Sequence, residues 1–319
     1  MGVGMKLTII TAALLSLLCG QLPAEEKITK KDSQEILSYL ASDELGGRGS
    51  GEEGNKQAAR FIANKFKNYG LDPIHPPVYI TIHPPPPPID GHGYFQDFTY
   101  SYTVRVGLFR SRTVTVKTSN VVGIIRGKTD KCILFGAHFD HLGTKGGKIY
   151  NGADDNASGT TALLELAEAF ATTKVRPEHT LVFAAFSAEE VGLIGSRFYA
   201  NNPVAPLKKH NLMINMDMVG RLKGENPTLS LYSGNLTKDI TSLVRQVEKK
   251  YPFNFSFAPA GSRSDHAHFN RQGIPVLFFH TGSHPQYHQP TDDEHLINYD
   301  GLVEITKYIF EFTDKFMKL

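Results

Sequence analysis

The chain has 319 residues, of which 40% are hydrophobic and 21% are charged, a composition typical of globular proteins. Lys and Arg together number 34, Asp and Glu number 32, and the formal net charge is therefore only +2. This balance excludes the strongly basic surface expected of a protein that binds nucleic acid or an anionic membrane.

The N-terminal segment carries an export pattern. Residues 7 to 18, LTIITAALLSLL, form an apolar run that follows Lys6. Such a run is typical of a secretory signal peptide, and it is too short to span a bilayer comfortably. We expect cleavage after Ala24, a secreted or periplasmic location, no integral membrane span, and one catalytic domain over residues 25 to 319.

The two cysteines bear on how the N-terminus is processed and on whether a disulfide can form. Cys19 leaves open a lipid-anchored N-terminus, although Leu18 before it is larger than the residue that such a processing site prefers. After cleavage only Cys132 would remain, inside the apolar run CILFGA. We therefore expect a buried thiol and no internal disulfide.

The first two predicted elements are helices. Residues 32 to 44 place apolar residues at helical spacing after Asp32, a candidate N-cap, and residues 55 to 69 repeat this pattern until Gly70 ends it. The proline run at 84 to 88 fits neither a helix nor a central strand, because proline lacks the backbone donor. We expect a polyproline II segment there.

Strands dominate the middle of the chain. Alternation over residues 97 to 118 predicts an antiparallel hairpin at a sheet edge. Buried runs then alternate with helical segments: NVVGII, KCILFGA, the helix TALLELAEAFA, TLVFAAF, LMINMD, a helix near 236 to 250, IPVLFF and a closing helix from about 300. This order predicts an α/β three-layer sandwich with a mostly parallel central sheet, antiparallel edge strands and helices on both faces.

Metal-ligand residue types follow several of these buried runs directly. In an open α/β sheet, ligands bind beyond the carboxyl ends of the strands. The residues at those positions are His138, Asp140, Asp154, Asp155, Glu189, Glu190, Asp217 and His288. A lone Asp before a helix is usually an N-cap and a lone His is usually a surface residue. Their joint occurrence instead predicts a metal site, and nitrogen and oxygen ligands without thiolate suit catalytic zinc.

Six motifs in order carry a family resemblance. They are GAHFDHLG, GADDNASG, AFSAEEVGLIGS, NMDMVG, SDHAHF and YHQPTDD, preceded by LASDELGGRGSGEEGNKQAARFI. Over residues 32 to 319 the chain resembles the bacterial co-catalytic zinc aminopeptidases, a family that also includes glutaminyl cyclases and glutamate carboxypeptidases. The resemblance implies two zinc ions and peptide substrates with a free N-terminus.

The resemblance also implies a role for each residue. Asp154 would bridge the two ions, Glu190 and His288 would complete one, and His138 and Asp217 the other. Glu189 would be the general base that takes a proton from the metal-bound water and passes it to the leaving amine. Asp140 would fix the His138 tautomer, and Asp155 would support Asp154. Either of these two aspartates could instead be a solvated loop residue.

The oxyanion donor is less well defined. Some relatives place a tyrosine just before the SDH motif, where this chain has Gly261, so His266 is our candidate; a histidine that only hydrogen-bonds a loop is the alternative. Four other histidines, His141, His268, His284 and His295, are set aside because they do not fall on matched ligand positions, and His284 is the nearest competitor of His288.

Other activities occur on the same scaffold. A carboxypeptidase needs a cationic clamp, which Arg263 could supply. A glutaminyl cyclase is disfavoured by the peptidase form of GADDNASG and SAEEVG, and a metal-free binding homologue is disfavoured because all five ligand positions and Glu189 are present. The sequence leaves side-chain preference and oligomeric state open, as well as the metal at each position.

Overall fold

The computed structural model describes residues 24–74, 92–105, 110–173 and 175–319. The predicted signal peptide up to residue 23, including Cys19, and the proline run at 84 to 88 lie outside the described residues. Within those ranges, no helix is both long enough and apolar enough to cross a membrane. Cys132 is buried, as predicted.

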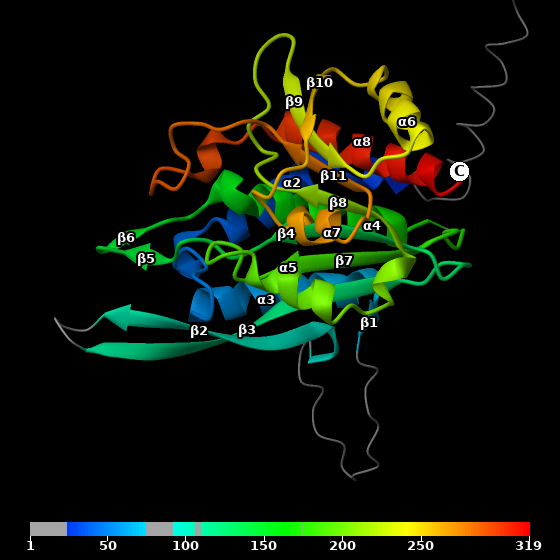
Figure 1. The fold of residues 1–319 in the computed structure, drawn as a ribbon. Helices are drawn as coiled ribbons and strands as arrows, with labels where there is room; N and C mark the ends of the chain where they lie inside the picture. Colours follow the sequence, from blue (N-terminus) through cyan, green and yellow to red (C-terminus); the bar gives the residue numbers. More distant parts are fainter. Residues whose placement is uncertain (1–23, 75–91, 106–109, 174) are drawn as a thin grey trace, which may run out of the picture.

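A nine-stranded sheet forms the centre of the described part of the chain, in the order β1-β3-β7-β4-β8-β11-β9-β10 with β2 paired to β3 (Figure 1). The central strands β7, β4, β8 and β11 run parallel, whereas β3 pairs antiparallel with β7, and β9 pairs antiparallel with β11. The strands are β1 (Asp72–Pro73), β2 (Phe95–Arg105), β3 (Ser111–Ile125), β4 (Cys132–His138), β7 (Thr180–Phe186), β8 (His210–Met216), β9 (Thr228–Gly234), β10 (Asn254–Pro259) and β11 (Val276–His280).

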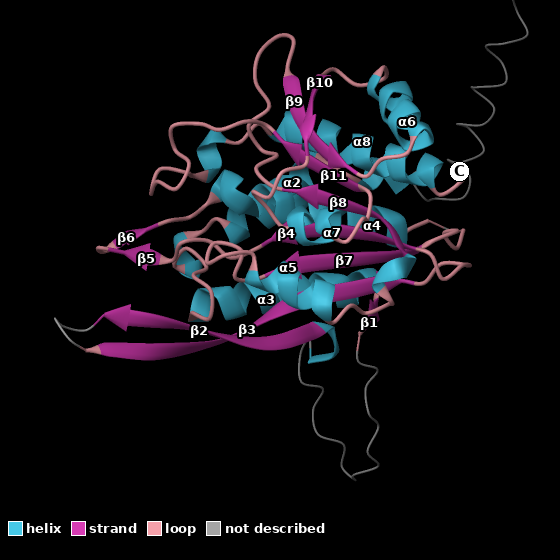
Figure 2. Ribbon diagram, viewed as in Figure 1, coloured by secondary structure: helices cyan, strands magenta, loops and turns pink. Residues whose placement is uncertain are grey.

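Helices cover both faces of this sheet, as Figure 2 shows. Alternate residues of the central strands point to opposite sides, so Phe135 joins one core and Leu134 the other. The larger core includes α2 (Lys30–Leu40), α3 (Glu53–Tyr69), α4 (Gly159–Ala171), α6 (Lys238–Glu248) and α8 (Tyr299–Phe316), and the smaller one α5 (Ile194–Asn201) and α7 (His266–Arg271). The predicted three-layer α/β sandwich is confirmed.

The local predictions differ from the structure in three places. The first helix begins at Lys30, and its N-cap is Thr29, whose hydroxyl accepts from the Asp32 amide; Asp32 is therefore not the cap. The predicted hairpin is confirmed, but its second strand runs without a break into NVVGII and forms one strand, β3. Strands β9 and β10 were not predicted, and they extend the sheet beyond β11.

Several ligand-type residues follow strand ends at one edge of the sheet. His138 is the last residue of β4, Glu189 follows β7 by three residues, and Asp217 directly follows β8. The turn η4 (Ala153–Ser158) leads into α4, and a small hairpin of β5 (Thr144–Lys145) and β6 (Lys148–Ile149) projects beside this edge (Figure 1). Parallel strands end at a common edge, which explains how residues far apart in the sequence meet there.

Candidate metal centre

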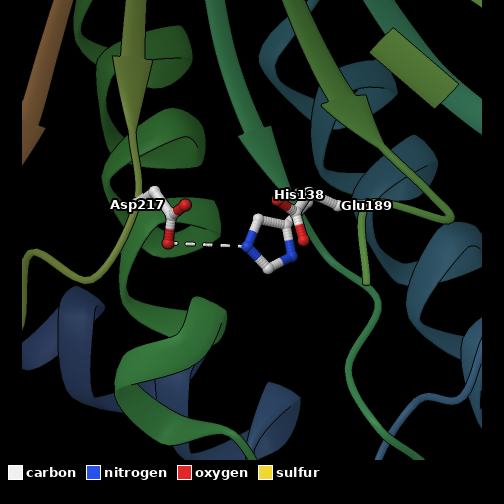
Figure 3. A group of neighbouring side chains, drawn as sticks. All are labelled: His138, Glu189 and Asp217. Atoms are coloured by element: carbon white, nitrogen blue, oxygen red, sulfur yellow. Dashed lines mark ion pairs between the residues drawn. The ribbon is translucent and has the colours of Figure 1, made fainter. Parts of the chain in front are cut away.

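One group of ligand atoms is formed by His138, Glu189 and Asp217, which Figure 3 shows converging from three segments. One ligand atom from each residue lies within 4.8 Å of the others. The His138 Nε2 lies 3.5 Å from Asp217 Oδ1. The opposite ring nitrogen, Nδ1, donates to the Asp140 carbonyl at 3.1 Å, which leaves Nε2 as the nitrogen that faces the carboxylates.

A second group is formed by His141, Asp155 and Glu190, again with ligand atoms within 4.8 Å of one another. His288 joins it, because its Nε2 lies 3.1 Å from Asp155 Oδ2 and 3.2 Å from Glu190 Oε2. The competitor His284 instead pairs with Asp154, with 3.1 Å between Nε2 and Oδ2. The structure therefore brings His288, and not His284, to the predicted ligand set.

Asp155 connects the two groups. Its Oδ1 lies 3.4 Å from His138 Nε2 in the first group, while its Oδ2 faces His288 in the second. The Oδ2 atom is buried and accepts no well-aligned hydrogen bond in the described part of the chain. A buried carboxylate oxygen without such a donor is unusual, and it fits an atom that binds a metal ion.

Asp154 does not occupy the bridging position that the family resemblance implies. Its Oδ1 accepts the Gly220 amide at 2.7 Å, and its Oδ2 faces His284. The roles of the two adjacent aspartates are therefore reversed: Asp155 lies between the groups, and Asp154 holds the chain that follows Asp217. Successive side chains of a turn point in different directions, so the pattern DD could not show which one faces the site.

The two adjacent glutamates have different surroundings. Glu190 accepts from His141 Nδ1 at 2.6 Å and faces His288, whereas the carboxylate of Glu189 makes no hydrogen bond or ion pair with any described residue. The Asp140 carboxylate accepts both of their amides, at 3.1 Å from Glu189 and 3.4 Å from Glu190. It therefore positions the turn that carries both glutamates.

The predicted role of Asp140 is thus only partly correct. Its backbone carbonyl accepts from His138 and orients that ring, but its carboxylate lies 3.9 Å from the same nitrogen. His266 also differs from the prediction. It is fully buried, donates from Nε2 to the Ala260 carbonyl at 2.7 Å and stacks on Phe278. It does not line the cavity at the site, so the alternative of a loop histidine fits the structure better.

Two residues outside the predicted site hold the turns around it in place. Asp292 accepts the backbone amides of Asp154 and Asp155 at 3.0 Å each and pairs with the buried Arg221. Arg48 is fully buried and donates to the carbonyls of Phe139, Asn151, Gly152 and Leu40. Both Asp292 and Arg48 lie in motifs of the resemblance, but only the fold shows what they contact.

The pKa values reflect the crowding of charge in the site. Burial lowers the pKa of His138, but the carboxylates of Glu189, Asp217 and Asp155 outweigh it and raise this pKa well above its usual value. The nearby carboxylates of Asp155 and Glu190 raise the pKa of His288 to about 10. Burial, together with nearby carboxylates, raises the pKa of Glu189 well above its usual value.

A cavity of about 180 Å³ opens beside the two groups. It is bounded on one side by His138, Asp155, Glu189, Asp217 and His288. Imidazole nitrogens and carboxylate oxygens are the donors that zinc takes at catalytic centres, where one position stays open to substrate. The donor types, the buried Asp155 Oδ2 that accepts no well-aligned hydrogen bond from a described residue, and the adjoining cavity all fit a zinc site.

The sequence and fold comparisons identify the family. The model for Peptidase family M28 matches residues 120–313, a range that contains both ligand groups. The chain belongs to peptidase family M28. This confirms the family resemblance that the six motifs carried.

Individual relatives agree with this membership. Leucine aminopeptidase 1 of Trichophyton rubrum is 27% identical over an alignment of 237 positions, and the match covers 68% of this chain and 62% of that relative. The match thus spans less than two thirds of the relative's length. The zinc aminopeptidase BSAP of Bacillus subtilis has the same fold, with a TM-score of 0.68, 18% identity and coverage of 89% and 95% of the two chains. Glutaminyl cyclase of Porphyromonas gingivalis also has a TM-score of 0.68, with 18% identity and coverage of 90% and 98%.

Proposed function

We propose that this protein is a zinc-dependent aminopeptidase that hydrolyses the N-terminal peptide bond of peptides. The observation that carries the proposal is the position of Asp155 between two sets of ligands, with the unpaired carboxylate of Glu189 beside them. Similarity to leucine aminopeptidase 1 supports the substrate class, and likeness to the zinc aminopeptidase BSAP supports zinc. The apolar run at residues 7 to 18 supports an exported enzyme.

Two zinc ions fit the ligand arrangement. His138 and Asp217 would hold one ion, Glu190 and His288 the other, and Asp155 would serve both. The assignment differs from the sequence-based one only in the bridging residue. When bound, the ions would polarise the scissile carbonyl and lower the pKa of water at the site.

The side chains of this chain would carry the remaining steps. Glu189 has no hydrogen-bond partner among the described residues and borders the cavity, so it is free to accept a proton from the attacking water and to pass it to the leaving amine. Asp140 keeps Glu189 and Glu190 pointing in their separate directions by binding both backbone amides. This positioning would leave Glu189 free to carry the proton while Glu190 binds the metal.

A panel of aminoacyl-chromophore substrates tests this function. Each substrate is assayed with the metal-loaded protein, after chelation, and after zinc is restored, beside an N-acetylated version and a glutaminyl peptide assayed for cyclisation. We expect cleavage of the free amines only, loss of that cleavage on chelation, and recovery with zinc. Equal cleavage of the blocked compounds, or cyclisation without cleavage, would overturn the proposal.

A further inference from the structure

The cavity has a second wall that the metal ligands do not form. This wall is aromatic: Tyr232 and Phe278 stack with ring centroids 5.1 Å apart, and His280 meets Tyr232 edge-on at 6.3 Å. Met218 is buried beside them. With a volume of about 180 Å³, the cavity has room for one amino-acid side chain rather than for a length of peptide.

Arg263 also lines this cavity. It lies on the loop before α7, is exposed, and forms no hydrogen bond or ion pair among the described residues. The acids that line the cavity are Asp155, Glu189 and Asp217, all of them at the metal end. Arg263 is therefore a cation at the cavity with its donors available, and a guanidinium matches the geometry of a carboxylate.

His280 provides a second donor in the same cavity. Its Nδ1 accepts the Gly282 amide at 2.7 Å. A ring nitrogen that accepts carries no proton, so in the neutral ring the proton is on Nε2, and Nε2 is a donor in either charge state. His280 and Arg263 both line the cavity and both offer hydrogen-bond donors. The carboxylates that line the cavity belong to Asp155, Glu189 and Asp217, on the side of the candidate metal centre.

We propose that Arg263, assisted by His280, binds a carboxylate of the substrate and makes this site selective for anionic substrates. This inference rests on the proposed peptidase function. The carboxylate has two possible sources: the side chain of an N-terminal Glu or Asp, or the free C-terminus of a dipeptide. An aliphatic N-terminal side chain would contact the aromatic wall but would form no charge-assisted hydrogen bond with the guanidinium.

The first arm of the test compares N-terminal side chains. The metal-loaded protein is assayed with Glu, Gln, Leu and Lys coupled to one chromophoric amide, so that no C-terminal carboxylate is present. We expect kcat/KM for Glu to exceed that for Gln about tenfold, in line with a charge-assisted hydrogen bond. Arg263→Met should remove this ratio, and Arg263→Glu should shift the preference to Lys.

The second arm tests the C-terminal source. Dipeptides of the form Xaa-Leu are compared with their C-terminal amides in the wild type and in Arg263→Met. A preference for the free acid that disappears in the variant assigns the carboxylate to the C-terminus. Calorimetric titration with free L-glutamate and L-glutamine gives a readout that does not depend on turnover.

A matched control separates a local effect from a change in net charge. Arg112 on β3 is exposed and lies outside the cavity, so Arg112→Ser removes the same charge and should leave the Glu to Gln ratio unchanged. If the wild type cleaves Gln and Leu substrates but shows no preference for a carboxylate in either arm, the inference fails while the peptidase function stands. If no free amine is cleaved, the proposed function itself fails.

Discussion

The Asp155 Oδ2 lies 3.1 Å from His288 Nε2, and its Oδ1 lies 3.4 Å from His138 Nε2, so one carboxylate faces two histidines that are 150 residues apart in the sequence. Its neighbour Asp154 faces the other way, toward Gly220 and His284.

We expect Asp155→Asn to bind less zinc after dialysis and to lose turnover, because an amide is a poor bridging ligand. Asp154→Asn should keep most of the zinc. Elemental analysis of the two variants decides between them, and the reverse order would restore Asp154 as the bridge.

Substitutions of Glu189 and Glu190 test the proposal that Glu189 carries the proton and Glu190 binds the metal. Glu189→Gln should keep the zinc content of the wild type and lower kcat about 10²–10⁴-fold, since it removes a proton carrier and no ligand. Glu190→Gln should lower the zinc content as well, because Glu190 contacts His141 and His288. Zinc content and kcat are measured on the same samples. A Glu189→Gln variant with near-normal kcat would contradict the proposed role.

Arg48 provides a test of stability. Its guanidinium donates to four carbonyls around the ligand turns and is fully buried. Arg48→Met leaves those carbonyls without their donor, and we expect the free energy of unfolding to fall by about 3 kcal/mol or more. Arg60→Met is the control, because Arg60 forms an exposed pair with Glu53 and its loss should cost less than about 1 kcal/mol. Urea unfolding measures both, and equal losses would contradict the role given to Arg48.

Glu165 on α4 predicts a pH dependence of the free energy of unfolding. Burial raises the pKa of this carboxyl to about 8, while it accepts from the Ser33 hydroxyl at 2.8 Å and the Thr29 amide at 3.3 Å. Because the folded pKa lies above the unfolded one, the folded state is favoured below pH 4.5, and this stability is lost progressively as the pH rises toward 8.

Glu165→Gln should remove that loss, because the amide resembles the protonated carboxyl. We expect the variant to gain stability over the wild type between pH 6 and pH 8, on the order of 1–2 kcal/mol. Urea unfolding at both pH values, with and without chelator, measures the difference. The other titrating groups are the same in the variant and the wild type, so their contributions cancel in the difference between the two free energies of unfolding. A difference independent of pH would show that Glu165 does not titrate in this range.

The sequence was most informative where burial and periodicity act locally. Continuous apolar runs such as CILFGA and TLVFAAF predicted central strands, and the structure has them as β4 and β7. The hydrophobic pattern could not predict β9 and β10, whose residues are less uniformly buried. It also placed the first helix two residues late, because Thr29 and not Asp32 makes the capping hydrogen bond.

What the sequence determined by itself was the family, the fold class and the edge of the sheet where ligand residues gather, because hydrophobic runs end just before those residues. Only the tertiary structure decided which of two adjacent aspartates lies between the ligand groups and which of two histidines joins them. It also showed that His266 is buried against Ala260 and that Arg263 lines the cavity. The physical reason is that side-chain direction on a turn depends on contacts with distant segments, here Gly220, His284 and Asp292, which no local pattern records.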